Sequence, residues 1–158
     1  MDLSKFTDRA RGFLQAANVI ATREDHQMVV PEHILKALLD DDKGFASNLI
    51  TRAGGDAQRV RDAVEVALAK VPKVSGDAGQ VYLDSATGKV LDEAAKVAKK
   101  AGDSFVPVER ILMALAMVKG PAKEALDAGK VTAQALNSAI NDIRKGRTAD
   151  SASAEEGY

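Results

Sequence analysis

The chain of 158 residues has no cysteine, 4% aromatic residues and a formal net charge of −1. These values exclude disulfides and thiolate chemistry, and they disfavour nucleic acid as a partner because phosphate binding needs a basic surface. A hydrophobic fraction of 46% without tryptophan predicts an aliphatic core that suits packed helices. The N-terminus lacks a signal-peptide pattern, and the longest apolar run, residues 111–118, is too short to span a bilayer. We therefore expect a cytoplasmic protein that does not bind membranes.

The first half of the chain predicts four helices in the order long, medium, short, medium. Apolar residues recur at steps of three and four over residues 6–20, which predicts a long helix that starts near Ser4. Pro31 opens a second helix, where its missing N–H costs nothing. A short third helix is expected over residues 45–53, and Asp56 caps a fourth.

The second half repeats this order after a segment, residues 71–83, that has no helical period and predicts a linker. The expected elements are a long helix capped by Asp84 or Ser85, a helix opened by Pro107, a short helix near 122–128 and a last helix capped by Thr132. Residues 147–158 are small, polar and acidic, so we expect a flexible tail or linker there.

Two phrases of eleven residues indicate that the halves are copies of each other. Residues 29–39 read VVPEHILKALL and residues 106–116 read VPVERILMALA, with six identical positions. Each half has about 75 residues, which is marginal for an independent core, so the two should bury their open faces against each other. The sequence therefore predicts an all-α fold of two pseudo-two-fold-related four-helix repeats. The expected boundaries are about 3–70 and 81–145 for the repeats, 1–146 for the whole domain and 147–158 for the tail.

No arrangement of residues predicts catalysis. His26 and His33 are the only histidines, and without cysteine we interpret them as packed or solvated residues rather than metal ligands. The segment SATGKVL fails the phosphate-loop pattern, because Val90 stands where a serine or threonine is required. Glu32 and Glu109 lie at the starts of the repeated helices, where negative charge offsets the helix dipole, and a catalytic carboxylate pair is the alternative. We expect no enzyme activity, metal or cofactor in this chain.

Three stretches together resemble the Clp N-terminal domain in its ClpB-type form: the repeated phrase, the start FTDRARGFLQAA, and KKAGDSFV before the second phrase. The resemblance covers about residues 3–145. It implies a module that precedes the ATPase rings of a homohexameric AAA+ chaperone, which uses ATP and Mg and works with a DnaK-type system after heat stress. Such a domain engages hydrophobic segments of unfolded or aggregated polypeptides for disaggregation and refolding. The isolated domain is expected to be a monomer.

The resemblance also implies a client-binding site. Three polar positions linked with client handling in ClpB-type domains fall on Thr7, Asp103 and Glu109, which are equally explained as helix-start and turn residues. An apolar groove is implied beside the second long helix and the turn that follows it, at Val90, Leu91, Phe105, Val106 and Arg110. Arg110 stands where relatives often carry an apolar residue.

Two other functions stay open at this stage. The first is an N-domain that docks adaptor proteins for a Clp protease unfoldase of the ClpA or ClpC type, which shares the same fold. The second is a small helical hydrolase or a nucleic-acid binder. The absence of cysteine, the two isolated histidines and the net charge of −1 weigh against this second group.

Overall fold

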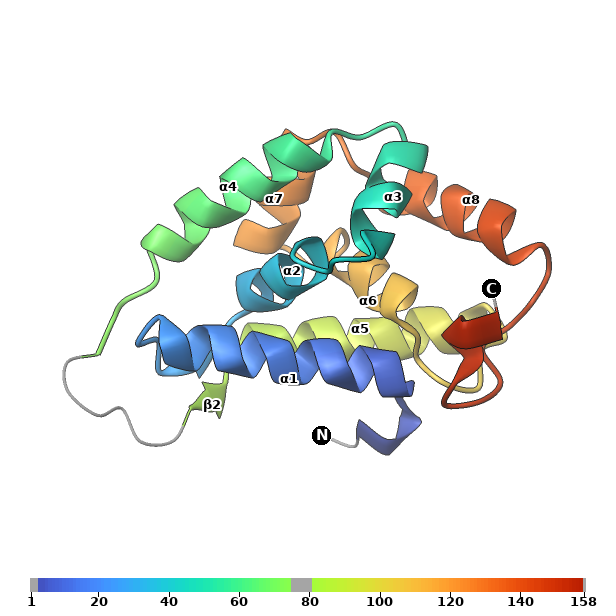
Figure 1. The fold of residues 1–158 in the computed structure, drawn as a ribbon, viewed down its shortest axis with the longest axis horizontal. Coiled ribbons are helices and arrows are strands. Elements are labelled where there is room, and N and C mark those ends of the chain that lie inside the picture. Colours follow the sequence, from blue (N-terminus) through green and yellow to red (C-terminus); the bar gives the residue numbers. More distant parts are fainter. Residues whose placement is uncertain (1–2, 75–80, 158) are drawn as a thin grey trace.

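The computed structural model describes residues 3–74 and 81–157 (Figure 1). It confirms an all-α fold, with eight α-helices in the described residues. The helices are α1 (Asp8–Arg23), α2 (Pro31–Leu39), α3 (Phe45–Arg52), α4 (Ala57–Ala69), α5 (Ser85–Lys100), α6 (Val108–Leu115), α7 (Pro121–Ala128) and α8 (Ala133–Arg144). Two short strands, β1 (Met28–Val29) and β2 (Tyr82–Leu83), and two 3-10 helices, η1 (Leu3–Lys5) and η2 (Ala154–Gly157), complete the described elements. None of the helices in these ranges is long and apolar enough to cross a membrane.

The helix starts follow from capping. Four helices begin after a side chain that accepts a backbone hydrogen bond from the first turn: Thr7, Asp56, Asp84 and Thr132. The first helix therefore starts at Asp8 and not near Ser4, which lies in the separate 3-10 turn. Pro107 occupies the N-cap position of α6, one residue earlier than predicted.

The two repeated phrases form the central helices of the domain. Every residue of α6 is buried, and every residue of α2 except Lys36 is buried. In Figure 1, α2 and α6 lie in the middle, with α1 and α5 on one side and the other four helices on the opposite side. Helices buried on all faces cannot exist without neighbours, so each half needs the other to complete its core.

Packing between the helices follows a pseudo-two-fold pattern. Within each half, the first helix packs on the second, as α1 on α2 and α5 on α6. Between the halves, the partners are exchanged, so that α4 packs on α7 and α3 packs on α8. The same exchange relates the contact of α1 with α6 to that of α2 with α5. This reciprocity is the arrangement that the repeated sequence predicts.

Two short parallel strand pairings follow the same pseudo-two-fold symmetry. β1 and β2 pair in parallel, with Met28 opposite Tyr82 and Val29 opposite Leu83. A matching parallel bridge joins Phe6 to Val106. β2 lies inside the segment predicted as a linker, and residues 75–80 of that segment lie outside the described residues.

The tail differs from the sequence-based expectation of a flexible segment from residue 147. Its backbone is hydrogen-bonded to the domain, because Ser104 and Phe105 both donate to the carbonyl of Ala149, and Asp8 donates to that of Ala152. Ala149 is fully buried. Low apolar content argued for disorder, whereas backbone groups of the domain that need partners hold the segment in place.

Two chain turns, one from each half, approach closely: the turn between α3 and α4 and the turn between α7 and α8. The N–H of Asp56 donates to the carbonyl of Gly129 at 2.9 Å. A Cβ atom on Gly129 would lie 2.4 Å from Val60 Cγ2 and 2.7 Å from the carbonyl oxygen of Asp56. Glycine is required here because there is no room for a Cβ atom. Its backbone conformation does not require glycine, since a φ of −89° is open to any residue.

Gly129→Ala should therefore lower the free energy of unfolding by about 1 to 3 kcal/mol, measured by urea denaturation. The control is Gly88→Ala at the end of the first turn of α5, where an added Cβ meets nothing within 4 Å. That variant should gain about 0.5 to 1 kcal/mol from the better helix propensity of alanine. Equal stability of the Gly129 variant and the parent chain would refute the close contact between the halves.

Candidate functional site

A cleft of about 730 Å³ opens between α1, α5 and the paired strands. Its apolar wall includes Leu3, Leu14, Val19, Val29, Leu83 and Leu91. The exposed fractions of Val19 and Leu83 are 57% and 50%, so these two form an apolar rim at the surface. Gln15 and Asn18 lie on the same wall and supply side-chain amides that can donate and accept hydrogen bonds.

The strand pairing builds this cleft from residues that are far apart in the sequence. β1 and β2 place Val29 beside Leu83, with the former buried and the latter exposed. The hydroxyl of Thr87 donates to the carbonyl of Val29 at 2.6 Å and ties β1 to α5. Leu91, one turn further along α5, then lines the interior of the cleft.

Of the eight residues predicted for client binding, only Leu91 lines this cleft. Val90 faces a separate hollow of about 230 Å³. Phe105 is half-buried and Val106 is buried at the turn before α6. The structure therefore separates Leu91 from the Phe105 turn, although both were expected beside one groove.

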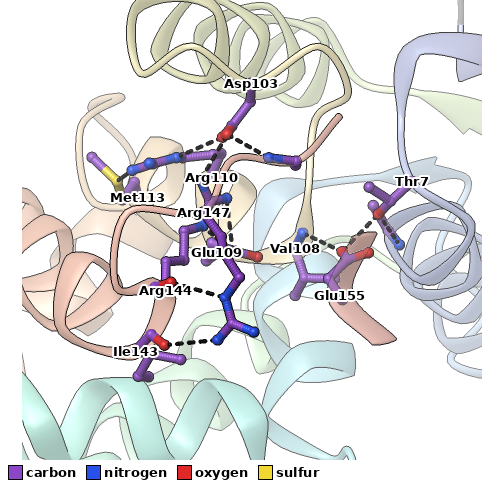
Figure 2. A network of polar contacts seen from close by, with 12 residues as sticks. Thr7, Asp103, Val108, Glu109, Arg110, Met113, Ile143, Arg144, Arg147 and Glu155 are labelled. Atoms are coloured by element: carbon purple, nitrogen blue, oxygen red, sulfur yellow. Dashed lines mark hydrogen bonds and ion pairs between the residues drawn. The ribbon is translucent and has the colours of Figure 1, made fainter. Parts of the chain in front are cut away.

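The polar residues Asp103, Glu109 and Arg110 belong to a buried ion cluster (Figure 2). Arg144 of α8 donates to Asp103 Oδ1 at 2.7 Å and to Glu109 Oε2 at 2.9 Å. Arg110 Nε donates to Asp103 Oδ2 at 3.2 Å, and its Nη1 donates to Asn137 Oδ1 at 2.9 Å. Two cations and two anions thus neutralise each other inside the second half.

Thr7 lies at the edge of this cluster and is fully buried. Its hydroxyl accepts from the N–H of Ala10 and donates to Glu155 Oε2 at 2.7 Å. The same oxygen of Glu155 accepts from the N–H of Val108 at 3.0 Å, as Figure 2 shows. Burial raises the pKa of Glu155, while these hydrogen bonds lower it and the nearby Glu109 raises it.

Arg144 and Glu155 are the main site residues that the sequence reasoning missed. For Arg144 a signal exists, because it follows the inward residues Leu136 and Ile140 at steps of four and so falls on the buried face of α8. Glu155 carried no such signal, since nothing in a small polar tail indicates where its carboxylate lies.

The repeated glutamates have different environments. Glu109 pairs with Arg144, whereas Glu32 forms no ion pair among the described residues and its Oε1 has no hydrogen-bond partner there. Burial raises the pKa of Glu32, and the nearby Asp84 and Glu124 raise it further. Interaction with the helix dipole therefore does not describe the two glutamates fully, because one also forms a buried ion pair and the other does not.

His26 and His33 form a buried neutral pair. The N–H of Val30 donates to His33 Nδ1 at 3.0 Å, so the proton of His33 lies on Nε2, which donates to His26 Nδ1 at 2.8 Å. Burial lowers the pKa of both rings, that of His33 to about 4. No group of three or more metal-binding side chains accompanies them in the described residues.

Known proteins resemble this chain in sequence and in fold. The family model of the Clp repeat (R) N-terminal domain covers residues 5–129. The chaperone protein ClpB of Mesorhizobium japonicum is 56% identical over 160 residues, which cover all of this chain and 18% of the relative. This chain thus spans about a fifth of the length of such relatives.

Solved structures share the same architecture. The N-terminal domain of Hsp104 from Candida albicans has a TM-score of 0.82 at 22% identity, with 96% of this chain and 99% of that one covered. A ClpV N-domain in complex with a VipB peptide has a TM-score of 0.70 at 18% identity, with 96% of each chain covered.

Glu32→Gln should raise the free energy of unfolding at pH 7 by about 1 kcal/mol, because it removes a buried charge without a cation partner. Glu109→Gln is the matched variant in the other half, and it should lower the same quantity by about 3 kcal/mol because Arg144 loses an anionic partner. Urea denaturation of both variants tests this contrast. Equal changes of the same sign would contradict the difference between the two halves.

The histidine pair should make stability fall on acidification. Both rings have lowered pKa values in the folded chain, whereas an unfolded histidine titrates near 6.5. The contribution is therefore complete above about pH 6.5 and is lost between 6.5 and about 4, as the unfolded chain takes up protons first.

Urea denaturation of the parent chain and of His33→Gln at pH 7 and pH 5 measures this effect. The stability difference between the two should shrink by roughly 2 kcal/mol at the lower pH. Groups such as Glu32 and Glu155 titrate in both chains and cancel in the difference. A pH-independent difference would rule out the neutral pair as a titrating element.

Proposed function

The chain belongs to the family of Clp repeat N-terminal domains, and we propose that it is the client-engaging domain of a ClpB-type chaperone. In this proposal it binds exposed hydrophobic segments of unfolded or aggregated polypeptides. The longer protein would then extract and refold those polypeptides with ATP and Mg bound elsewhere, as a homohexamer and together with a DnaK-type system. The chain itself would have no catalytic role.

The cleft with its exposed apolar rim is the observation that carries this proposal. Val19 and Leu83 expose large aliphatic side chains at the surface, and Leu14 and Leu91 continue the apolar wall inward. Folded proteins hide such side chains from water, so an unfolded segment gains more than a folded one from contact with this wall.

The polar part of the wall suits a polypeptide backbone. Gln15 and Asn18 offer amide groups to whichever N–H and C=O groups an extended segment presents. Apolar contacts combined with backbone hydrogen bonds depend little on client sequence. Weak binding, on the order of micromolar, would allow a client to be passed onward.

The comparisons support a peptide as the ligand and ClpB as the type. A structure of the same fold, the ClpV N-domain, was solved in complex with a VipB peptide. The identity of 56% to a ClpB chaperone favours client engagement over adaptor docking for a Clp protease. Adaptor docking is the second candidate, and it would use a surface other than an indiscriminate apolar cleft.

Leu83→Ser should weaken the binding of a fluorescein-labelled, casein-like unfolded client by about tenfold, because it removes an apolar group from the rim. Leu83 is half-exposed, so the fold should be retained, which circular dichroism checks. The matched control is Val66→Ser on α4, an aliphatic residue with 58% exposure that does not line the cleft.

Fluorescence anisotropy titrations give the dissociation constants of the three chains. The control variant should bind as the parent chain does. Identical affinities for the parent chain and a folded Leu83→Ser variant would refute the cleft as the client site.

A further inference from the structure

The segment that follows α8 is attached to the domain at two separate places. At the first, the N–H of Ala149 donates to Asp103 Oδ1 at 2.8 Å, and its carbonyl accepts from Ser104 and Phe105 at 2.8 and 2.9 Å. The residue thereby satisfies three polar groups of the turn between α5 and α6. In Figure 1 the segment lies against this end of the domain, near the start of α1.

At the second place, Glu155 joins the starts of two helices from different halves. Its Oε2 accepts from Thr7, the N-cap of α1, and from the N–H of Val108, the first residue of α6. Pro107 offers no side-chain cap to α6, so the carboxylate of Glu155 takes that role. Its exposed fraction is 4%.

The first half has an equivalent attachment. There the segment after α4 lies on the turn before α2. The N–H of Val74 donates to the carbonyl of Asp25, and the backbones of Lys73 and His26 form an isolated antiparallel β-bridge. In each half, the chain that leaves the fourth helix therefore binds the turn before the second helix. The position of the segment after α8 is thus a feature of the repeat.

The contact of this segment with the domain is mostly polar. Ala149 is its fully buried apolar residue, whereas Arg147, Thr148, Asp150 and Ser151 are exposed. Hydrogen bonds to turns and helix ends exchange readily with water, unlike a packed aliphatic surface. Asp103 and Thr7 stay engaged in the domain through Arg144 and Ala10 when the segment leaves.

We infer that residues 147–155 form a latch that fixes the direction in which the chain leaves this domain. Glu155 closes the latch, and Thr7 and Asp103 are the side chains of the domain to which the segment is hydrogen-bonded. In a protein as long as the relatives, a closed latch holds this domain at one orientation relative to the remainder of the protein, and an open latch frees it. The inference goes beyond the proposed function, since it stands whether or not the cleft binds clients.

Amide hydrogen exchange of the 158-residue chain, followed by NMR, tests the latch with Glu155→Ala. The diagnostic amides are those of Ser104 and Phe105, because they donate to Ala149 and make no bond to Glu155. We expect their exchange to accelerate by about tenfold or more in the variant. Amides of α2, and those of α6 from Ile111 onward, should keep their protection, which shows that the domain stays folded.

Asp150→Ala is the matched control, since Asp150 is an exposed carboxylate in the same segment. It should leave the exchange of Ser104 and Phe105 unchanged. Glu155→Gln, which retains an acceptor oxygen, should restore part of the protection lost in Glu155→Ala.

Three results would overturn the latch. One is faster exchange at Val108 alone, which makes Glu155 a local helix cap. Another is an unprotected Ser104 and Phe105 in the parent chain, and the third is an equal effect of Asp150→Ala. The client titration with Leu83→Ser reports on the cleft and not on these amides, so failure of one proposal is distinguishable from failure of the other.

Discussion

The complete burial of α2 and α6, Lys36 apart, is the constraint on which the rest of the structure depends. The two helices carry polar residues as well as apolar ones, and burial leaves no water to solvate them. Glu109 and Arg110 therefore require partners from other elements, which Asp103 and Arg144 supply. The position of α8 and the turn before α6 follow from this requirement as much as from apolar packing.

The two halves meet the same requirement with different chemistry. Asp103 and Arg110 stand 77 residues after His26 and His33, and both pairs join the turn before a central helix to that helix. One pair is ionic, and the other is a neutral imidazole pair that stays uncharged because burial disfavours a proton. The repeat thus preserves the geometry of this contact while its charge has diverged.

Local chemistry explains which features could be predicted from sequence. The caps Asp56, Asp84 and Thr132 act within one helical turn, so their helices were placed correctly. The cleft depends on the pairing of Val29 with Leu83, which are 54 residues apart, and no local pattern indicates that contact. The attached tail was missed for a similar reason, because its stability comes from polar groups elsewhere in the domain rather than from its own composition.

The two equivalent strand pairings differ in how far their side chains are exposed. Val29 pairs with Leu83 in the first position, and their counterparts 77 residues away, Val106 and Phe6, pair in the second. Leu83 has an exposed fraction of 50%, whereas that of Phe6 is 3%. The tail makes its contacts at residues that flank Phe6 and Val106, through Glu155 and Ala152. The two equivalent strand pairings thus lead to surfaces that differ in exposure, and the chain after α8 lies beside the buried one.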